Sequence, residues 1–290
     1  MTTVRDIIDQ GVQQFTQANL CFGHGVNSAW DEVVFLVLHS LQLPLNTSRE
    51  ILKRKLTSEE CEKIEALLRR RVVERKPLAY LINEAWFAKM PFYVDERVLI
   101  PRSPLAELIE QQLALWIDPH QVRRILDIGT GSGCIALACA HYFPEAIVDA
   151  TDVSSAALQV AAINLAKHQL SSRVNLIQAD IFPLERVIYD IIISNPPYVG
   201  EQELAELPAE YQHEPQMGLA AGKEGLVIIE RILHHAARYL SPHGILVVEV
   251  GNTVDELLKK FPQVPFLWPE FARGESEVFI LTKTESNKYF

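Results

Sequence analysis

The sequence predicts an α/β fold in which a mostly parallel sheet follows a small helical domain and a β-hairpin linker. After Arg124, short apolar runs typical of strands alternate with helical segments, and such alternation builds a parallel sheet with helices on both faces. Before about Leu81, apolar residues recur at helical spacing instead. Because 290 residues exceed one core of typical size, we expect a helical domain over 1–85, a linker over 86–104 and an α/β domain over 105–290.

The helical domain is predicted from its apolar spacing and from one helix start. Apolar side chains recur at helical spacing over 7–15 and again over 33–41. Thr57-Ser58-Glu59-Glu60 places a hydroxyl residue suited to capping before two acids of a first helical turn. Pro77 cannot continue this helix, so the helix should end before it.

The linker is predicted to be a hairpin of two short extended pieces. Residues 92–94 and 97–100 have strand-like composition, and Asp95-Glu96 separates them. Two prolines close the second piece, and the apolar spacing then predicts a helix over 105–116.

The α/β domain is predicted as alternating strands and helices. Strands are expected over 125–128, 147–151, 174–178, 189–194 and 245–250, and helices over 133–142, 154–168 and 226–240. The last apolar run, 277–281, has only loop before it, which is too short for a crossover helix. We therefore expect this final strand to run antiparallel to its neighbour.

Charge, cysteine usage and hydropathy exclude several classes of protein. The net charge is −10, and residues 1–95 hold 12 basic and 12 acidic side chains. The excess of acid therefore lies in residues 96–290, and such an acidic part binds duplex DNA poorly. The four cysteines form no C-x-x-C pair, so neither a metal site nor a disulfide framework is expected. Without a signal peptide or an apolar run near the ~20 residues of a membrane helix, we expect a cytoplasmic protein with no membrane partner.

A glycine loop follows the strand predicted at 125–128. Gly129-Thr130-Gly131-Ser132-Gly133 leads into a helix, and such a turn lets the backbone approach a ligand closely. Its third glycine comes one residue too early for the G-x-G-x-x-G dinucleotide fingerprint, and no Walker lysine follows. Asp152 ends the next strand, where its carboxylate can accept hydrogen bonds from both ribose hydroxyls of an adenosine.

A G-x-G-x-G loop with an acid ending the second strand resembles the class I S-adenosylmethionine-dependent methyltransferases. The resemblance implies a Rossmann-like, mostly parallel seven-stranded sheet with an antiparallel strand near the C-terminus. It implies S-adenosylmethionine as cofactor and S-adenosylhomocysteine as product, with the glycine loop beside the methionyl part and Asp152 on the ribose.

The resemblance also assigns roles to three further residues. Asp127 orders the glycine turn in this family or meets the ammonium group of the cofactor, and we favour the first. Asp180 falls where the family contacts the adenine, and Ile181 can pack on the base. For both acids, a solvated carboxylate at a strand end is the alternative.

The tetrapeptide Asn195-Pro196-Pro197-Tyr198 follows the strand predicted at 189–194, at the edge where open α/β sheets bind ligands. A planar amide or amine nitrogen carries two N–H donors, so its methylation needs an acceptor pair that holds both hydrogens. The side-chain oxygen of Asn195 and the carbonyl of Pro196 can form that pair, two prolines fix the backbone, and Tyr198 can pack against the substrate plane. A plain Pro-Pro turn is the alternative.

The tetrapeptide does not distinguish adenine amines from glutamine amides, but its flanks do. Residues 92–102, His213-Glu214-Pro215 and residues 220–226 resemble the protein-(glutamine-N5) methyltransferases, and this resemblance extends over nearly the whole chain. One branch of that family modifies the Gly-Gly-Gln loop of peptide release factors and usually continues Pro-Arg with Pro-Asp-Thr-Glu. Arg102 is followed here by Ser103-Pro104, which resembles the branch that modifies a glutamine of the third large-subunit ribosomal protein.

The resemblance implies that the helical domain recognises the protein substrate and that the second domain performs the chemistry. The partner is then the third large-subunit ribosomal protein or an assembly intermediate containing it, with no sequence-specific nucleic-acid binding. The release-factor enzyme is the alternative of the same fold, and a ribosome-assembly binding factor is the alternative of another class. Glu214 can shape the loop over the tetrapeptide or form a structural salt bridge, and both readings stay open.

Overall fold

The computed structural model describes residues 2–26, 28–271 and 277–290. The chain divides into two compact units, Met1–Ala85 with Pro208–His213 and Trp86–Leu207 with Glu214–Phe290. The segment Pro208–His213, predicted within the α/β domain, belongs instead to the helical unit. Among the helices of these described ranges, none is long and apolar enough to cross a membrane.

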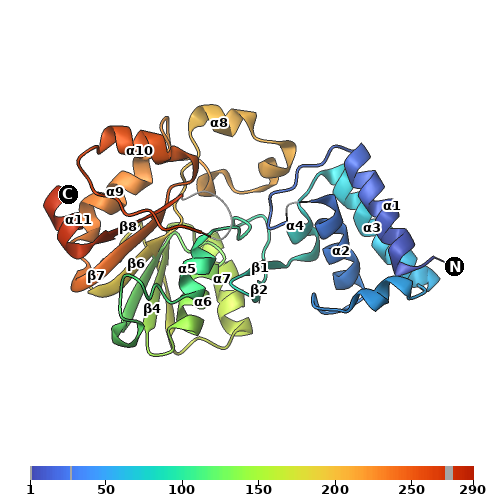
Figure 1. Ribbon diagram of the computed structural model, residues 1–290, viewed down its shortest axis with the longest axis horizontal. Helices are drawn as coiled ribbons and strands as arrows, with labels where there is room; N and C mark the ends of the chain where they lie inside the picture. Colours follow the sequence, from blue (N-terminus) through green and yellow to red (C-terminus); the bar gives the residue numbers. More distant parts are fainter. Residues whose placement is uncertain (1, 27, 272–276) are drawn as a thin grey trace. The chain divides into compact units, whose positions relative to one another are not determined.

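The α/β unit is built on a sheet with six strands in the described part of the chain (Figure 1). The strand order is β5-β4-β3-β6-β7-β8, and all neighbours are parallel except β7 and β8, which confirms the predicted antiparallel ending. The strands are β3 (Arg124–Ile128), β4 (Ile147–Asp152), β5 (Val174–Gln178), β6 (Tyr189–Ser194), β7 (Leu240–Glu249) and β8 (Val278–Thr282).

Within the described residues, a single bridge stands where the seventh strand of the expected sheet was predicted. Leu267 and Ile280 exchange two backbone hydrogen bonds, of 3.1 and 2.8 Å. Pro265 and Pro269 flank Leu267 and have no N–H to donate to a ladder, which opposes a longer strand. The connection from β7 to β8 contains a short helix, α10 (Val254–Lys260), where only loop was predicted.

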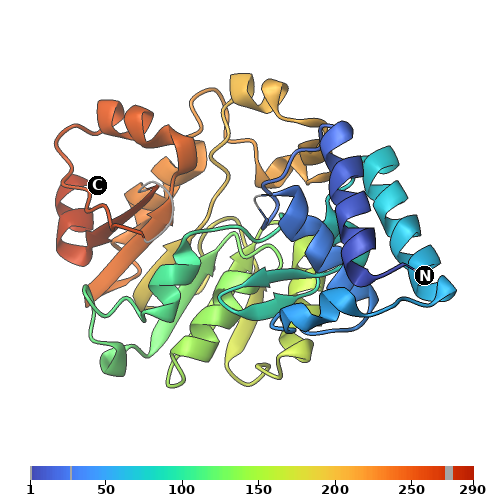
Figure 2. The same ribbon diagram turned by 45° about the vertical axis from the view of Figure 1, so that its right-hand side comes forward.

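The helical unit packs its helices around an apolar core of its own (Figure 2). Thr57 caps α3 and forms a capping box with Glu60, as the sequence predicts. A Cβ at Gly11 would lie 2.9 Å from side-chain atoms of Val33 and Leu68, so this glycine lets α1 approach α2 and α3 closely. The helices are α1 (Val4–Gln17), α2 (Ala29–Ser40), α3 (Ser58–Glu74) and α4 (Leu78–Ile82), with 3-10 turns at Arg49–Lys53 and Ala209–His213.

A buried cluster of charges binds the segment Pro208–His213 to the helices of its unit. Arg71 on α3 is fully buried and donates to Glu32 at 2.6 Å and to the Cys21 carbonyl at 3.0 Å. Glu210, also fully buried, accepts from the Cys21 N–H at 3.0 Å and pairs with Arg75 at 2.9 Å. Arg71 and Glu210 lie 3.5 Å apart. Hydrogen-bonded ion pairs therefore hold the segment in place. Each buried charge requires its partner, because an unpaired charge withdrawn from water is strongly destabilising.

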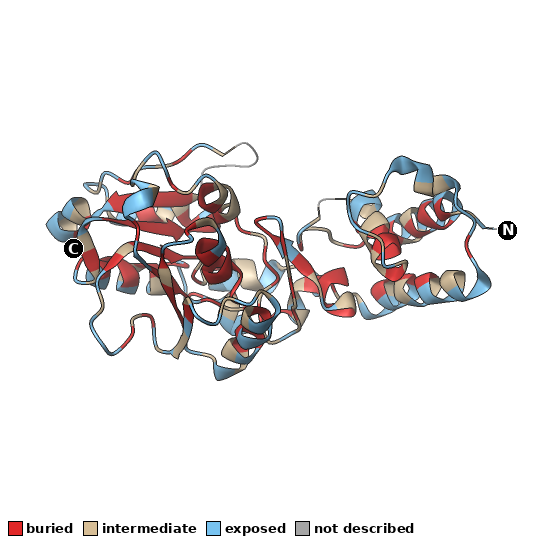
Figure 3. Cartoon of the chain, turned by 90° about the horizontal axis from the view of Figure 1, so that it is seen from below, coloured by how far each residue is buried: buried red, intermediate tan, exposed pale blue. Residues whose placement is uncertain are grey.

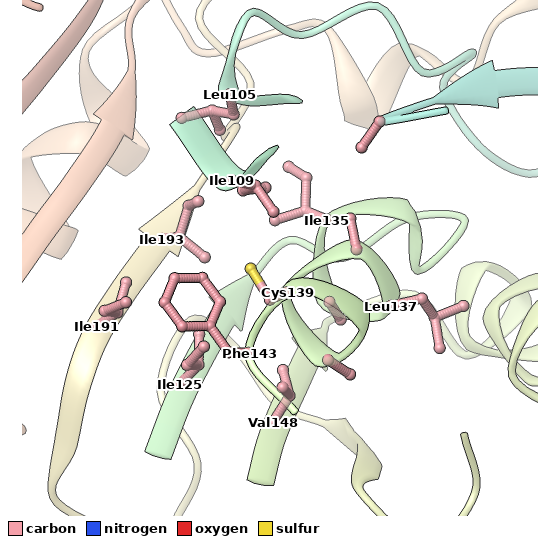
Figure 4. Packing of buried hydrophobic residues seen from close by; sticks show 14 of the residues in the cluster. Leu105, Ile109, Ile125, Ile135, Leu137, Cys139, Phe143, Val148, Ile191 and Ile193 are labelled. Carbon is pink, nitrogen blue, oxygen red and sulfur yellow. The ribbon is translucent and has the colours of Figure 1, made fainter. Parts of the chain in front are cut away.

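Successive side chains of a strand point to opposite faces of the sheet. The core of the α/β unit is therefore divided into two layers, one on each face. Figure 4 shows Ile125, Ile191 and Ile193 packing against the layer of α5 (Leu105–Glu110) and α6 (Cys134–Tyr142). Leu126 and Ile192 face the other layer, which contains α9 (Val227–Ala236). The strands are mostly buried on both faces, as Figure 3 shows in red, except the edge strand β5, which is largely half-buried or exposed. The remaining helices of this unit are α7 (Ser155–Lys167), α8 (Glu201–Glu206) and α11 (Lys283–Tyr289).

The linker hairpin lies earlier than predicted. Its strands are β1 (Ala85–Phe87) and β2 (Met90–Phe92), joined by two residues at positive φ. Residues 97–100, predicted as a strand, are irregular. The Asp95 carboxylate accepts a hydrogen bond from the Arg97 backbone N–H at 3.1 Å and pairs with the Arg97 guanidinium at 2.6 Å. These bonds stabilise a turn of the chain at Asp95.

Two predicted helices end early. α5 stops at Glu110, and Gln112 and Leu113 then adopt positive φ. α9 stops at Ala236, because Leu240 already pairs with Tyr189 as part of β7. In both places tertiary contacts override the local apolar spacing.

Candidate active site

A cavity of about 520 Å³ lies at the carboxyl ends of the central strands of the α/β unit. Ile128 ends β3, Asp152 ends β4 and Asn195 follows β6, and all three line the cavity. Residues 97–103 of the linker supply a further wall. The cavity is therefore at the edge where open α/β sheets bind ligands.

The glycine loop forms the wall between β3 and α6. Gly129, Gly131 and Gly133 have φ values of +72°, +55° and +81°, which L side chains rarely adopt. A Cβ at Gly129 or Gly131 would meet no atom within 4 Å, so the space in front of them is open. A Cβ at Gly133 would lie 3.2 Å from the Ala161 Cβ, so this glycine allows α6 to pack close to α7. Thr130 and Ser132 are buried between the glycines and line the cavity.

Asp127 is fully buried, so the alternative of a solvated carboxylate is wrong for this residue. Its Oδ2 accepts from the Thr130 hydroxyl at 2.6 Å and from the Ala136 N–H at 3.1 Å. Burial raises the pKa of Asp127 to about 7. Since Asp127 is not among the described residues that line the cavity, these bonds support the interpretation that it orders the glycine turn.

Asp152 lines the cavity and is bonded to the backbone on both oxygens. Its Oδ2 accepts from the Gly131 N–H at 2.9 Å, and its Oδ1 accepts from the Ser154 N–H at 2.8 Å. Burial raises the pKa of Asp152, although both N–H groups favour the ionised form. Each carboxylate oxygen retains lone-pair capacity, so Asp152 can still accept two ribose hydroxyls.

Asp180 and Ile181 line the same cavity. Asp180 is exposed and accepts two hydrogen bonds from Arg231, at 2.8 and 3.1 Å, and this pairing lowers its pKa. Ile181 has a φ of +74°, and the Phe182 N–H donates to the Asp180 carbonyl at 3.1 Å, which forms a γ-turn. A β-branched residue in that conformation costs about 1–3 kcal/mol, and such strain is typical of ligand sites.

Asn195, Pro196 and Pro197 line the cavity directly after β6. The Ser194 hydroxyl donates to the Ile128 carbonyl at 2.8 Å and so ties the end of β6 to β3. Within the described residues, the Asn195 side chain makes no hydrogen bond. Its amide can therefore bind a ligand in the cavity.

Tyr198 faces the protein interior. Its hydroxyl donates to the buried Glu249 at 3.0 Å, and Tyr198 is not among the described residues that line the cavity. A Cβ at Gly251 would lie 2.3 Å from the tyrosine ring, and one at Gly225 would lie 2.2 Å from its carbonyl oxygen. Packing of Tyr198 against a substrate plane stays a prediction.

The sequence did not predict the linker wall of the cavity or the carboxyl group behind the tetrapeptide. Arg102 pairs with buried Glu214 at 2.7 Å, and Glu214 also accepts the Ile100 N–H at 3.1 Å, which supports the salt-bridge reading of Glu214. The sequence could have indicated Glu249 as a candidate site residue, because it is an acid at the end of an apolar strand. In the ranges that the structure describes, no cluster of three His, Cys, Asp or Glu side chains could hold a metal ion.

Comparison with known proteins identifies the family. Residues 109–210 match the family described as methyltransferase small domain. Over 98% of its length the chain is 44% identical to the ribosomal protein uL3 glutamine methyltransferase of Neisseria gonorrhoeae, covering 96% of it. It is 45% identical to the protein of the same name in Neisseria meningitidis serogroup B, covering 94% of that protein. The chain belongs to the uL3 glutamine methyltransferase family. This membership confirms the methyltransferase class and the predicted branch.

A solved structure supports the fold of this methyltransferase. The catalytic domain of hMettl16 in complex with the MAT2A 3'UTR hairpin 6 superposes with a TM-score of 0.53, covering 86% of this chain and 91% of that chain. The two are 19% identical, so the similarity concerns the fold alone. It confirms the class I methyltransferase architecture predicted from the glycine loop.

The residues of the cavity fit the cofactor of this methyltransferase class. The open space before Gly129 and Gly131 accepts a ligand against the backbone, Asp152 offers a carboxylate, and Ile181 offers an apolar surface. Hydrogen bonds from hydroxyls to an ionised group are worth about 1.5–3 kcal/mol each. We therefore predict that Asp152→Ala raises the dissociation constant for S-adenosylmethionine at least about tenfold in calorimetric titration.

Glu145→Ala is the matched control for Asp152→Ala, because Glu145 is an exposed acid in the turn between α6 and β4. It should leave the dissociation constant within about twofold, as expected of an exposed substitution. If the two variants bound S-adenosylmethionine equally well, Asp152 would not be a cofactor-binding residue.

Proposed function

We propose that this chain transfers a methyl group from S-adenosylmethionine to the side-chain amide nitrogen of a glutamine in the large-subunit ribosomal protein uL3, giving N5-methylglutamine and S-adenosylhomocysteine. The observation that carries the proposal is the Asn195-Pro196 acceptor pair on a cavity that also includes the glycine loop and Asp152. The identity of 44–45% to uL3 glutamine methyltransferases over nearly the whole chain supports this choice of substrate.

The chain's residues perform the reaction by positioning and by electrostatic stabilisation. The cofactor supplies a methyl group on a cationic sulfur. The Asn195 side-chain oxygen and the Pro196 carbonyl accept the two amide hydrogens, so the nitrogen lone pair is directed toward the methyl group. The glycine loop and Asp152 would hold S-adenosylmethionine, whose sulfonium would supply the methyl group and leave as the neutral thioether S-adenosylhomocysteine. The acceptors stabilise the positive charge that develops on nitrogen, and the proton then leaves to water.

The helical unit is proposed to recognise uL3 or an assembly intermediate that contains it, and the reaction would take place in the cytoplasm. The Asn195-Pro196-Pro197-Tyr198 loop and the segment Pro208–His213 follow one another closely along the chain, and the segment belongs to the helical unit. Substrate recognition is therefore assigned to the helical unit and methyl transfer to the α/β unit, and the stretch 195–213 contributes residues to both.

Mass spectrometry of ribosomal proteins and release factors from a strain without this gene, beside its parent, tests the substrate. We predict that uL3 becomes lighter by one methyl group and that the loss maps to a glutamine. Complementation with the wild-type gene should restore the methyl group, and complementation with Asn195→Ala should not. An unchanged uL3 together with release factors that lose the methyl group would reject uL3 in favour of the Gly-Gly-Gln substrate.

A further inference from the structure

Behind the cavity, one buried acid connects two of its walls. Glu249 ends β7 and is 2% exposed. Its carboxyl group accepts a short hydrogen bond from the Ser103 hydroxyl and a second one, of 3.0 Å, from the Tyr198 hydroxyl. A carboxyl group so withdrawn from water is retained only where such partners satisfy it.

The two partners of Glu249 come from different walls of the cavity. Ser103 ends the linker stretch 97–103 and itself lines the cavity. Tyr198 directly follows Asn195, Pro196 and Pro197. Through Glu249, the linker wall and the acceptor loop are joined to the end of a central strand of the sheet.

The fit around Tyr198 shows that its position is closely determined. Gly251, with a φ of +49°, leaves no room for a Cβ beside the ring, and Gly225 leaves none beside the Tyr198 carbonyl. Within the described residues, the hydroxyl end of the ring is held by Glu249. Burial raises the pKa of Glu249 to about 7, which agrees with its enclosure.

We propose that Glu249 is a positioning residue for methyl transfer: its bonds to Ser103 and Tyr198 hold the Asn195-Pro196 acceptor pair at the distance from the cofactor that the reaction requires. The inference rests on the proposed function, because it assigns the acceptor pair to the reacting nitrogen. Misplacement of reacting groups by about 1 Å can cost about 100-fold in rate. Loss of Glu249 should therefore lower kcat while the glycine loop and Asp152 still bind the cofactor.

The chain contains a matched control for this bond. The Tyr189 hydroxyl at the start of β6 donates to Asp149 at 2.8 Å, and both residues are buried. This second tyrosine–carboxylate bond lies in the same unit, and neither residue is among those that the structure places around the cavity. Tyr189→Phe therefore removes a bond of the same chemistry away from the acceptor loop.

The test uses the full chain with purified uL3 and S-adenosylmethionine. It compares Glu249→Ala, Glu249→Gln, Ser103→Ala and Tyr189→Phe by kcat, by KM for uL3, by the calorimetric dissociation constant of S-adenosylmethionine and by melting temperature. We expect Glu249→Ala to lower kcat about 10- to 100-fold and to change cofactor affinity less than about threefold. Glu249→Gln, which keeps the shape and can bond to both hydroxyls, should retain kcat within about threefold.

Two further variants keep the inference testable if Glu249→Ala does not fold, although Ser103→Ala also removes the acceptor of the Leu105 N–H, 3.1 Å away. Ser103→Ala should lower kcat about three- to tenfold, whereas Tyr189→Phe should leave it within about twofold at a comparable loss of melting temperature. Equal kcat values for Ser103→Ala and Tyr189→Phe, or a wild-type kcat in Glu249→Ala, would overturn the positioning role. If the wild type does not methylate uL3, the proposed function fails, and the same variants assayed on release factor decide the role of Glu249.

Discussion

Replacing Asn195 with alanine is expected to lower kcat for glutamine methylation at least about 100-fold. The substitution removes the side-chain acceptor that we propose to hold one amide hydrogen and to stabilise charge on the attacking nitrogen. Loss of one such preorganised group typically costs about 10²–10³ in kcat. Because the Asn195 side chain makes no hydrogen bond within the described residues, folding should be retained. The measurement is single-turnover transfer of labelled methyl to uL3.

Two controls make the Asn195 result specific. The dissociation constant of S-adenosylmethionine should stay within about threefold, since the glycine loop and Asp152 are unchanged. Asn175→Ala removes an exposed asparagine whose amide donates to Asp149 at 2.7 Å, and it should leave kcat near the wild-type value. A ribosome-assembly defect in a deletion strain that Asn195→Ala fully corrects would favour the binding-factor alternative over catalysis.

Replacing Arg71 with methionine is expected to destabilise the helical unit by about 3–5 kcal/mol, because removing one partner of a buried ion cluster leaves the others uncompensated. Glu32 and Glu210 would both lose a bond while remaining buried. Hydrogen exchange at the amides of α2 and α3 reports the free energy of opening of this unit. Exchange in the sheet strands of the α/β unit should change far less.

Arg70→Met is the adjacent control. Arg70 pairs with Glu74 at 2.8 Å, but both side chains are substantially exposed, so the loss should be within about 1 kcal/mol. Similar exchange rates in Arg70→Met and Arg71→Met would show that the buried cluster contributes no more than a surface pair.

The mostly parallel type of the sheet and the place of the site followed from local patterns. Alternating strands and helices after Arg124 require a parallel sheet, and the carboxyl ends of parallel strands meet at one edge. The glycine loop, Asp152 and Asn195 each follow a strand along the chain, so their convergence on one cavity could be predicted. Spacing within the glycine loop and the residues flanking the tetrapeptide then indicated the methyltransferase class and its branch.

The partners of single side chains could not be predicted, because they join residues that are distant in the chain and leave no periodic signal. Ser103 and Glu249 are 146 positions apart, and Arg71 and Glu210 are 139 apart. Only folding shows that Pro208–His213 belongs to the helical unit and that residues 97–100 are irregular instead of a strand. The sequence by itself determined the type of sheet and the edge that carries the site, since these depend on local spacing and chain order. The tertiary structure alone decided which buried charges hold that loop and the helical unit in place, since burial and pairing depend on the whole packed chain.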